Sequence, residues 1–436
     1  MQKYRWDWSR DADAGTPLAV VRAETADHVQ IAVRWAAAEA VPIITRGAGT
    51  GLSGGSSGRS GALMIALDRM DTIEIDSANQ VAVVGPGAIN KAVKLAAAEH
   101  GLWYPPDPSS YEICSIGGNI ATNAGGLCCV KYGVTTDYVL GLDVVLADGS
   151  LITLGGKRLK DVAGLSLLKL FVGSEGTLGI VTRAILRLVP AQGERSTLVA
   201  TFAGVDEAAR AVVAIRQLAR PSMLEFMDRA VINAVEDFKP MGLDRSVAAM
   251  LVVQSDAPSV ARTAEIDIVR SCCADALDVF VTDDAEEGEM FAAARRMAFD
   301  AVEVRGALLF EDVGVPIPRL PQLLAEVARI AGEHALEIPV VAHAGDGNTH
   351  PLIVFDAADP TSKQRARDAF AAIMAAAIAL EGTITGEHGV GRAKKAALPD
   401  QLGSEVMALS RRVKAAFDPQ GLLNPGVMFD ESPPDG

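Results

Sequence analysis

The chain of 436 residues is long enough for two or three domains with separate hydrophobic cores. Hydrophobic residues make up 49% of it, which excludes an intrinsically disordered protein. A formal net charge of −15 and the lack of any run of Lys or Arg exclude a protein that tracks nucleic-acid phosphates.

The five cysteines and the apolar segments restrict the compartment and the metal chemistry. No C-x-x-C spacing occurs, so neither a zinc knuckle nor an iron–sulfur cluster of the usual kind is expected. The odd cysteine count fits a reducing compartment. Met1–Asp13 lacks the apolar core of a signal peptide, and the longest apolar run, near Ala371–Leu380, is shorter than the roughly 20 residues of a membrane span. We therefore expect a cytoplasmic protein that does not span the membrane.

The first 190 residues alternate short β-branched runs with helical stretches. A helix is predicted over Thr25–Glu39, where Val29, Val33, Ala36 and Ala37 recur at helical spacing and Thr25 and Asp27 are possible caps. The predicted strands are Leu18–Val21, Pro42–Thr45, Leu63–Leu67, Val81–Val84, Val144–Leu146 and Ile180–Leu188. This pattern indicates an α+β or α/β domain.

After Pro190 glycine becomes sparse and helices dominate, so we place a domain boundary there. The predicted helices are Glu207–Ala219, Ser259–Cys272 and Pro321–His334, and the predicted strands are Leu198–Phe202, Ala248–Gln254 and Ala307–Glu311. This region is predicted to be an antiparallel sheet covered by helices. Glycines return beyond about Thr383. The expected domains are 1–190, 191–382 and 383–436.

The most distinctive local feature is the loop Arg46–Ser56. Seven of the fifteen residues from Gly47 to Gly61 are glycine. Glycine permits positive φ and close approach of the backbone, so N–H groups can converge into a site for a pyrophosphate. Gly49, Gly51 and Gly54 also imitate a dinucleotide-binding Rossmann turn. That alternative is disfavoured because the Gly- and Ser-rich run Gly55–Gly61 is not expected to open a helix.

Two further glycine-rich segments favour a large anionic cofactor over isolated structural turns. Ser115–Gly126 contains two Gly pairs separated by small polar residues, and Gly173–Gly179 leads into the strand that begins at Ile180. Three such loops in one domain are better explained by one shared ligand. There is no G-x-x-x-x-G-K-[ST] motif, so a P-loop NTPase is excluded.

Histidines concentrate in two glycine-flanked segments. Of the six histidines, His343 and His350 flank the sequence Ala-Gly-Asp-Gly-Asn-Thr, and His388 lies in Gly386–Gly389. Two histidines and one acidic residue from converging segments would suit a divalent metal with an open position for substrate. The alternative is that these histidines only cap local turns.

Together with Pro105–Pro108, the three loops resemble the FAD domain of the vanillyl-alcohol-oxidase/p-cresol-methylhydroxylase fold. Within it the chain is most similar to D-lactate dehydrogenases, glycolate oxidase flavoprotein subunits and D-2-hydroxyglutarate dehydrogenases. The resemblance covers nearly the whole chain. It implies an α+β fold with a two-part FAD-binding domain, an antiparallel-sheet-and-helix substrate (cap) domain and a C-terminal segment that returns to the flavin.

The resemblance also assigns the cofactor. Some members attach the flavin through a His four residues after the loop Arg, and here that position is Thr50, which implies non-covalent FAD. The residues that the resemblance assigns to FAD are Arg46, Gly47, Ala48, Gly49, Thr50, Gly51, Leu52, Ser53, Pro106, Asp107, Gly117, Gly118, Asn119, Thr122, Asn123, Gly125, Gly126, Glu175, Gly176, Gly179, Ile180, Val181 and Asn424.

By the same resemblance, His343, His350 and Glu387 bind a divalent metal (Zn²⁺, or Mn²⁺ or Fe²⁺), and His388 is the general base. Oxidation of a 2-hydroxy acid removes the hydroxyl proton and transfers a hydride from C2 to flavin N5. A metal lowers the pKa of a hydroxyl that it binds, and a neutral imidazole can take the proton near neutral pH. The flavin supplies the redox step.

A substrate carboxylate requires a cation, preferably a bidentate one. Phe291–Phe299 resembles the family segment that supplies it, and Arg295 matches best, with Arg296 as the alternative if the register is shifted. Hydroxyglutarate-type members have a Lys two residues before the position of Asp312, where this chain has Phe310. We therefore favour D-lactate, glycolate or a more apolar acid, although Arg305 could replace the missing Lys.

The predicted function is an FAD-dependent dehydrogenase of a small D-2-hydroxy acid. The alternatives are a D-2-hydroxyglutarate dehydrogenase, an oxidase that uses O₂ directly, and a non-catalytic flavin-binding subunit of a complex. Without a C-x-x-C motif in the chain, electrons must leave to O₂ or to a separate acceptor protein or quinone. A homodimer is the default expectation for the oligomeric state.

Overall fold

The computed structural model describes residues 1–430 and divides into two compact units. The first unit contains Met1–Gly125, Val134–Ala191 and the chain from Glu387 onward. The second unit contains Gly126–Gly133 and Gln192–Gly386. The chain therefore enters the second unit twice and returns to the first unit for its C-terminal part.

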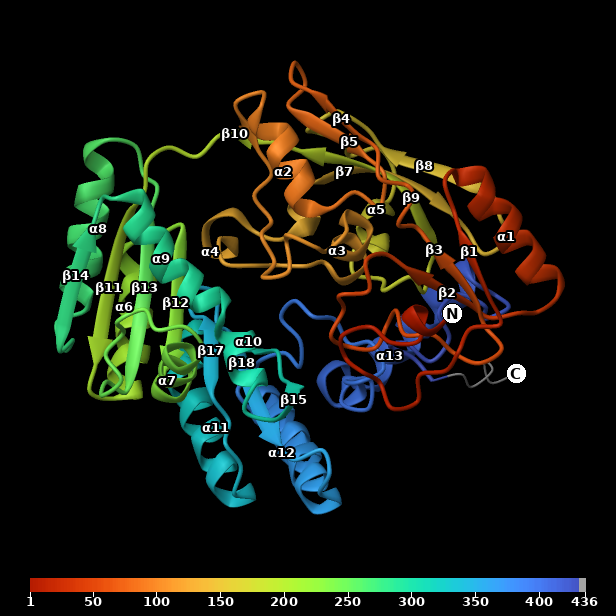
Figure 1. The fold of residues 1–436 in the computed structure, drawn as a ribbon. Coiled ribbons are helices and arrows are strands. Elements are labelled where there is room, and N and C mark those ends of the chain that lie inside the picture. Colours follow the sequence, from red (N-terminus) through yellow and green to blue (C-terminus); the bar gives the residue numbers. More distant parts are fainter. Residues whose placement is uncertain (431–436) are drawn as a thin grey trace. The chain divides into compact units, whose positions relative to one another are not determined.

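Two main sheets build the first unit (Figure 1). A three-stranded parallel sheet has the order β1-β3-β2, and a five-stranded antiparallel sheet has the order β4-β5-β9-β7-β8. A short ladder joins β6 to β10. The bounds are β1 Ala19–Arg22, β2 Ile43–Arg46, β3 Leu63–Ala66, β4 Ile73–Asp76, β5 Val81–Val84, β6 Leu102–Trp103, β7 Val139–Val145, β8 Leu151–Gly155, β9 Ile180–Arg187 and β10 Val189–Pro190.

The helices of the first unit pack on these sheets through apolar faces. In α1, Thr25 caps the first turn by accepting a hydrogen bond from His28 N at 3.3 Å, and Val29, Val33 and Ala36 are buried in one core with Ile43 of β2. The bounds of the helices are α1 Ala26–Ala38, α2 Asn90–Ala98, α3 Ile116–Thr122, α5 Leu168–Phe171 and α13 Leu398–Phe417, and the 3₁₀ turns are Gln2–Tyr4 and Thr135–Asp137.

One antiparallel sheet forms the centre of the second unit. Its order is β14-β11-β13-β12-β17-β18-β15, and β16 also pairs with β18. The bounds are β11 Ser196–Phe202, β12 Met223–Asp228, β13 Ala249–Ser255, β14 Asp278–Thr282, β15 Ala307–Phe310, β16 Val313–Gly314, β17 Val340–His343 and β18 Asn348–Phe355.

Two groups of helices cover this sheet. Helices α7, α9 and α10 share an apolar core with alternate residues of β12, β13, β17 and β18. Helices α6, α8, α11 and α12 form the other group, in which α11 and α12 lie side by side (Figure 1). The bounds are α4 Cys129–Tyr132, α6 Val205–Leu218, α7 Arg229–Phe238, α8 Val260–Cys272, α9 Ala285–Arg296, α10 Ala298–Glu303, α11 Leu320–His334 and α12 Pro360–Ala379, with a 3₁₀ turn at Ile317–Arg319.

Two segments differ from the sequence expectation. Ser115–Gly126, expected as a loop, contains helix α3, because Ser115 caps it and accepts a hydrogen bond from Gly118 N at 3.3 Å. Gly126–Gly133, expected in the first domain, clusters with the second unit, where Lys131 and Tyr132 both bind the carboxylate of Asp256. Among residues 1–430, no helix is long and apolar enough to cross a membrane.

Candidate active site

Two of the predicted cofactor segments meet in the first unit at Ser115. The Ser115 hydroxyl accepts hydrogen bonds from Ala48 N at 3.2 Å and from Gly118 N at 3.3 Å. A side chain at Gly47 would require Ser115 to move, because a Cβ atom there would lie 2.2 Å from the Ser115 Oγ. The first glycine loop, which follows β2, is thereby fixed to the start of α3.

The Pro105–Pro108 segment joins the same assembly through Asn90. The Asn90 side-chain amide donates to Pro106 O at 3.2 Å and to Asn119 Oδ1 at 3.0 Å. Asn90 begins helix α2 and is fully buried. Sequence reasoning did not select Asn90, because a single Asn at the start of a helix has no distinctive pattern.

The C-terminal motif connects the first and third glycine loops. Asn424 Nδ2 donates to Gly55 O at 2.8 Å and to Glu175 O at 2.7 Å. Asn424 is buried and has a positive φ of 44°, a conformation that Asn tolerates better than most residues. The predicted cofactor residues from 46–53, 106–125, 175–181 and 424 therefore belong to one unit, whereas Gly126 clusters with the other unit.

Glu175, in the third loop, holds the segment that contains His388. Its carboxylate accepts hydrogen bonds from Val390 N and Gly391 N, each at 2.8 Å. Burial raises the pKa of Glu175 from 4.5 to about 7, because the carboxylate is desolvated and the two backbone donors only partly compensate. Glu175 thus has a structural role in addition to its predicted place along the cofactor.

His388 is also attached to the first glycine loop by its backbone. Ser53 Oγ donates to the carbonyl oxygen of His388 at 3.1 Å, and Arg392 N donates to Ser53 O at 2.8 Å. The Arg392 guanidinium donates to Gly54 O at 3.0 Å. His388, the predicted general base, therefore lies in a segment that is hydrogen-bonded to the predicted FAD loops through several residues.

Asp7, in the N-terminal segment, stabilises the first glycine loop through hydrogen bonds. It was not among the residues predicted from the sequence. Its carboxylate accepts hydrogen bonds from Ser56 N at 3.2 Å and from the Ser57 hydroxyl at 2.9 Å. The side chain is 3% exposed. An acidic residue in a charged N-terminal stretch carries no sequence signal for this role.

In the second unit, His343 and His350 lie on one face of the hairpin formed by β17 and β18. The register pairs His343 with Asn348 and His350 with Val341, which places the two histidines diagonally across the strands. Their rings meet edge to face with centroids 5.1 Å apart, and both side chains are buried. The structure therefore brings together the two histidines that the sequence selected.

Two buried charged residues lie next to His343. Glu225 of β12 approaches His343 Nδ1 with both carboxylate oxygens at 2.9 Å, and its Oε2 lies 2.9 Å from Arg295 Nε in an ion pair. Arg295 is 4% exposed, and its Nη2 is buried without a hydrogen-bond partner among the described residues. Its neighbour Arg296 instead pairs with Glu289.

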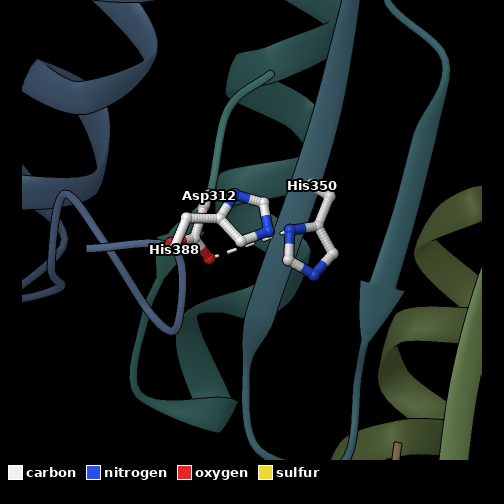
Figure 2. A group of neighbouring side chains, drawn as sticks. All are labelled: Asp312, His350 and His388. Atoms are coloured by element: carbon white, nitrogen blue, oxygen red, sulfur yellow. Dashed lines mark ion pairs between the residues drawn. The ribbon is translucent and has the colours of Figure 1, made fainter. Parts of the chain in front are cut away.

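Asp312 links His350 to the segment that leads back to the first unit. Figure 2 shows Asp312 beside His350, with Oδ1 of Asp312 3.7 Å from Nδ1 of the imidazole. The other oxygen of Asp312 accepts hydrogen bonds from Thr385 Oγ1 at 2.6 Å and from Gly386 N at 3.0 Å. Asp312 is fully buried.

Gly386 packs closely against β18. A Cβ atom on Gly386 would lie 2.3 Å from Asn348 Oδ1, so a side chain cannot be accommodated without movement. Glu387 and His388, the latter also labelled in Figure 2, follow Gly386 directly in the chain. Since consecutive Cα atoms are about 3.8 Å apart, covalent connectivity alone keeps Glu387 close to the anchored Gly386.

Position 310, where hydroxyglutarate-type members are expected to have a Lys, is a Phe that stacks on another aromatic ring. Phe310 stacks on Phe299 with ring centroids 4.2 Å apart and an interplanar angle of 14°. Arg305, the possible substitute for the absent Lys, forms ion pairs with Glu337 at 2.6 Å and Asp237 at 3.2 Å. Arg305 is thus engaged by two carboxylates of its own chain.

Residues 17–155 match the FAD binding domain model, and residues 191–428 match the model of the FAD linked oxidases, C-terminal domain. The glycolate oxidase subunit GlcD of Bacillus subtilis is 41% identical over 420 residues, which is 95% of this chain and 89% of that protein. The D-lactate dehydrogenase of Archaeoglobus fulgidus is 33% identical over 420 residues, 95% and 91% of the two chains.

Solved structures with little sequence identity share the fold. p-Cresol methylhydroxylase has a TM-score of 0.82 at 18% identity and covers 98% of this chain and 92% of its own. 4-Ethylphenol oxidase from Gulosibacter chungangensis has a TM-score of 0.77 at 19% identity, with 94% and 89% covered. The fold class expected from the sequence is confirmed.

The class that these matches define is the FAD-linked oxidoreductases. The chain belongs to the FAD-linked oxidase family and is an enzyme of the glycolate oxidase/D-lactate dehydrogenase type, as the resemblance implied.

The residues of the second unit also fit a divalent metal. Two imidazoles on one face of a hairpin are nitrogen donors that Zn²⁺, Mn²⁺ and Fe²⁺ accept, and the carboxylate of Glu225 on the Nδ1 side of His343 is the outer partner that metal-binding histidines commonly have. For FAD, the glycine segments of the first unit are fixed to one another by Ser115 and Asn424, as a single large ligand requires.

Proposed function

We propose that the protein is an FAD-dependent dehydrogenase that oxidises a small D-2-hydroxy acid, such as D-lactate or glycolate, to the 2-oxo acid. The observation that supports the proposal most directly is the environment of Arg295. Its guanidinium is buried beside the histidine pair, yet Nη2 has no hydrogen-bond partner among the described residues. Leaving a buried charged donor unsatisfied is costly, and a substrate carboxylate would satisfy it.

The chain's own residues then have distinct roles. Arg295 would bind the substrate carboxylate, and His388 would take the proton of the C2 hydroxyl while the C2–H bond breaks and the carbonyl forms. FAD, held without a covalent bond, would accept the hydride from C2 and supply the redox step. A divalent metal held by His343, His350 and Glu387 would favour loss of the hydroxyl proton by stabilising negative charge on the substrate oxygen.

The residue at position 310 bears on how many carboxylates the substrate has. A dicarboxylic acid would bring a second carboxylate, and burying it without a cation is costly. Phe310 is stacked on Phe299 and Arg305 is already paired with Glu337 and Asp237. These contacts favour an acid with one carboxylate over 2-hydroxyglutarate.

The direct test is His388→Ala assayed with an artificial electron acceptor. We expect the variant to retain FAD, because the loops that would hold it are intact, and to lose turnover of D-lactate and glycolate by about 100-fold or more, the usual contribution of a general base. Wild-type turnover in the FAD-loaded variant would remove His388 as the base.

A further inference from the structure

We propose that Glu225 is a positioning residue that fixes both the metal ligand His343 and the substrate-binding Arg295. The inference rests on the function proposed above. It adds one carboxylate that orients the imidazole and lies beside the guanidinium as its counter-ion. All three side chains lie in the second unit, and at most 4% of any of the three residues is exposed.

The strand pairing places Glu225 opposite His343. Strands β12 and β17 are antiparallel, with Phe226 paired with Ala342 and Met227 with Val341. Continuing this register by one residue sets Glu225 against His343, and directly opposite residues point to the same face of a sheet. The contact between them is therefore fixed by the backbone ladder and does not depend on a flexible loop.

The chemistry of the contact determines which nitrogen of His343 is available. A carboxylate has no proton to donate, so His343 Nδ1 is the donor to Glu225, at 2.9 Å from both oxygens. A neutral imidazole has one N–H group, and therefore Nε2 retains its lone pair. Histidines that bind metals commonly donate their other N–H to a carboxylate, which sets the tautomer and the ring orientation.

The same carboxylate compensates the charge of Arg295. Its Oε2 lies 2.9 Å from Arg295 Nε, and a buried cation without a counter-ion is strongly unfavourable. Among the described residues Nη2 has no hydrogen-bond partner, and neither does Nε, which meets Glu225 only as an ion pair, so Nη2 is left for another acceptor. Glu225 thus stabilises a guanidinium while leaving part of it open to a substrate carboxylate.

The test is Glu225→Gln in the full-length, FAD-loaded protein. The amide keeps the size of the side chain and removes its charge. We expect the affinity for Zn²⁺, measured by competition with a fluorescent chelator, to fall about tenfold to 100-fold, as is typical when such an outer partner is removed. The KM for D-lactate or glycolate should rise as well, while the FAD content stays at the wild-type level.

Glu236→Gln is the matched control. Glu236 is also a buried glutamate of the second unit, but its carboxylate accepts hydrogen bonds from Met241 N and Leu243 N, in the segment that follows helix α7. Its substitution should lower stability without changing the Zn²⁺ affinity. Equal Zn²⁺ affinity in Glu225→Gln and wild type would overturn the inference.

His350→Ala separates the failure of this inference from failure of the proposed metal site. If His350→Ala loses Zn²⁺ affinity and Glu225→Gln does not, only the role of Glu225 is wrong. If neither substitution changes the affinity, both the metal site and the inference are wrong.

A measurement on the wild-type protein keeps the inference testable if Glu225→Gln does not fold. Nitrogen-15 labelling of the six histidines, with His343→Asn to identify its signal, reports the tautomer in the FAD-loaded, metal-free protein. We expect the proton of His343 on Nδ1. A proton on Nε2 with Nδ1 bare would overturn the inference.

Discussion

Arg295 and Arg296 are neighbours in α9 with different surroundings. Arg295 is buried against Glu225, whereas Arg296 pairs with Glu289, whose side chain is 45% exposed. The sequence left the choice between them open, because a shift of one residue cannot be detected without the structure. The burial and the unsatisfied Nη2 favour Arg295 as the substrate-binding residue.

Arg295→Lys preserves the charge beside Glu225 but removes the planar fork that can bind a carboxylate through two nitrogens. Losing one hydrogen bond between charged groups costs about 1.5–3 kcal/mol, so we expect kcat/KM for the hydroxy acid to fall by at least about tenfold. Steady-state kinetics measures this, with Arg296→Lys as control. A larger loss in the control would assign the role to Arg296.

Glu175 predicts a pH dependence of stability. Its pKa is raised by burial from 4.5 to about 7, so the folded state holds the proton that the unfolded state releases. The stability from this group is therefore fully present below about pH 4.5 and is lost as the pH rises through about 7. A shift of this size corresponds to about 3 kcal/mol.

We expect Glu175→Gln to remove the pH-dependent contribution of Glu175 to the free energy of unfolding. Urea unfolding of both proteins at pH 5 and pH 8 should show the wild type losing up to about 3 kcal/mol more than the variant between these values. The exposed Glu74, substituted by Gln, serves as control. Parallel pH dependences of wild type and Glu175→Gln would show that Glu175 does not change its protonation in this range.

At the scale of elements, helix α3 links two cofactor segments through its cap. Ser115→Ala should reduce the free energy of unfolding by about 1 kcal/mol, the usual value of an N-cap side chain. It should also weaken FAD binding, because Ala48 N loses the acceptor that fixes the first loop. Thermal unfolding and an FAD titration of the apoprotein measure the two effects.

Thr25→Ala is the control for this substitution. Thr25 caps α1 in the same way, and its side chain accepts its hydrogen bond from His28 N in the first turn of that helix. It should lower stability by a similar amount and leave the FAD affinity unchanged. If both variants bind FAD as the wild type does, the Ser115 contact does not shape the cofactor site.

Local patterns were sufficient for many elements but not for contacts between distant strands. The 3.6-residue period and the Thr25 cap gave α1 within one residue at each end. Strand β12 does not alternate between buried and exposed residues, because five of its six residues are buried. The segment that contains Glu225 was therefore not predicted as a strand. Its partner His343 is 118 residues away, and only the sheet order joins them.

At the scale of the whole molecule, the residues proposed to bind FAD and the residue proposed to bind the substrate carboxylate belong to different units. The glycine segments, Asn424 and His388 belong to the first unit, and Arg295, His343 and His350 to the second. The change in glycine content near Pro190 predicted a domain boundary there, and the long segment of the second unit begins at Gln192. The membership of 126–133 in the second unit could not be predicted, because its contacts, such as the ion pair of Lys131 with Asp256, are with residues distant in the sequence.

The measurement that tests the central claim most directly is the visible spectrum of the FAD-loaded protein before and after anaerobic addition of D-lactate, glycolate and D-2-hydroxyglutarate. We predict that D-lactate or glycolate bleaches the oxidised flavin bands, because the hydride from C2 reduces the flavin. D-2-hydroxyglutarate should bleach them at least about tenfold more slowly, because the position of Phe310 offers no cation to its second carboxylate. Flavin bands that stay unchanged with all three acids would contradict the proposed reaction.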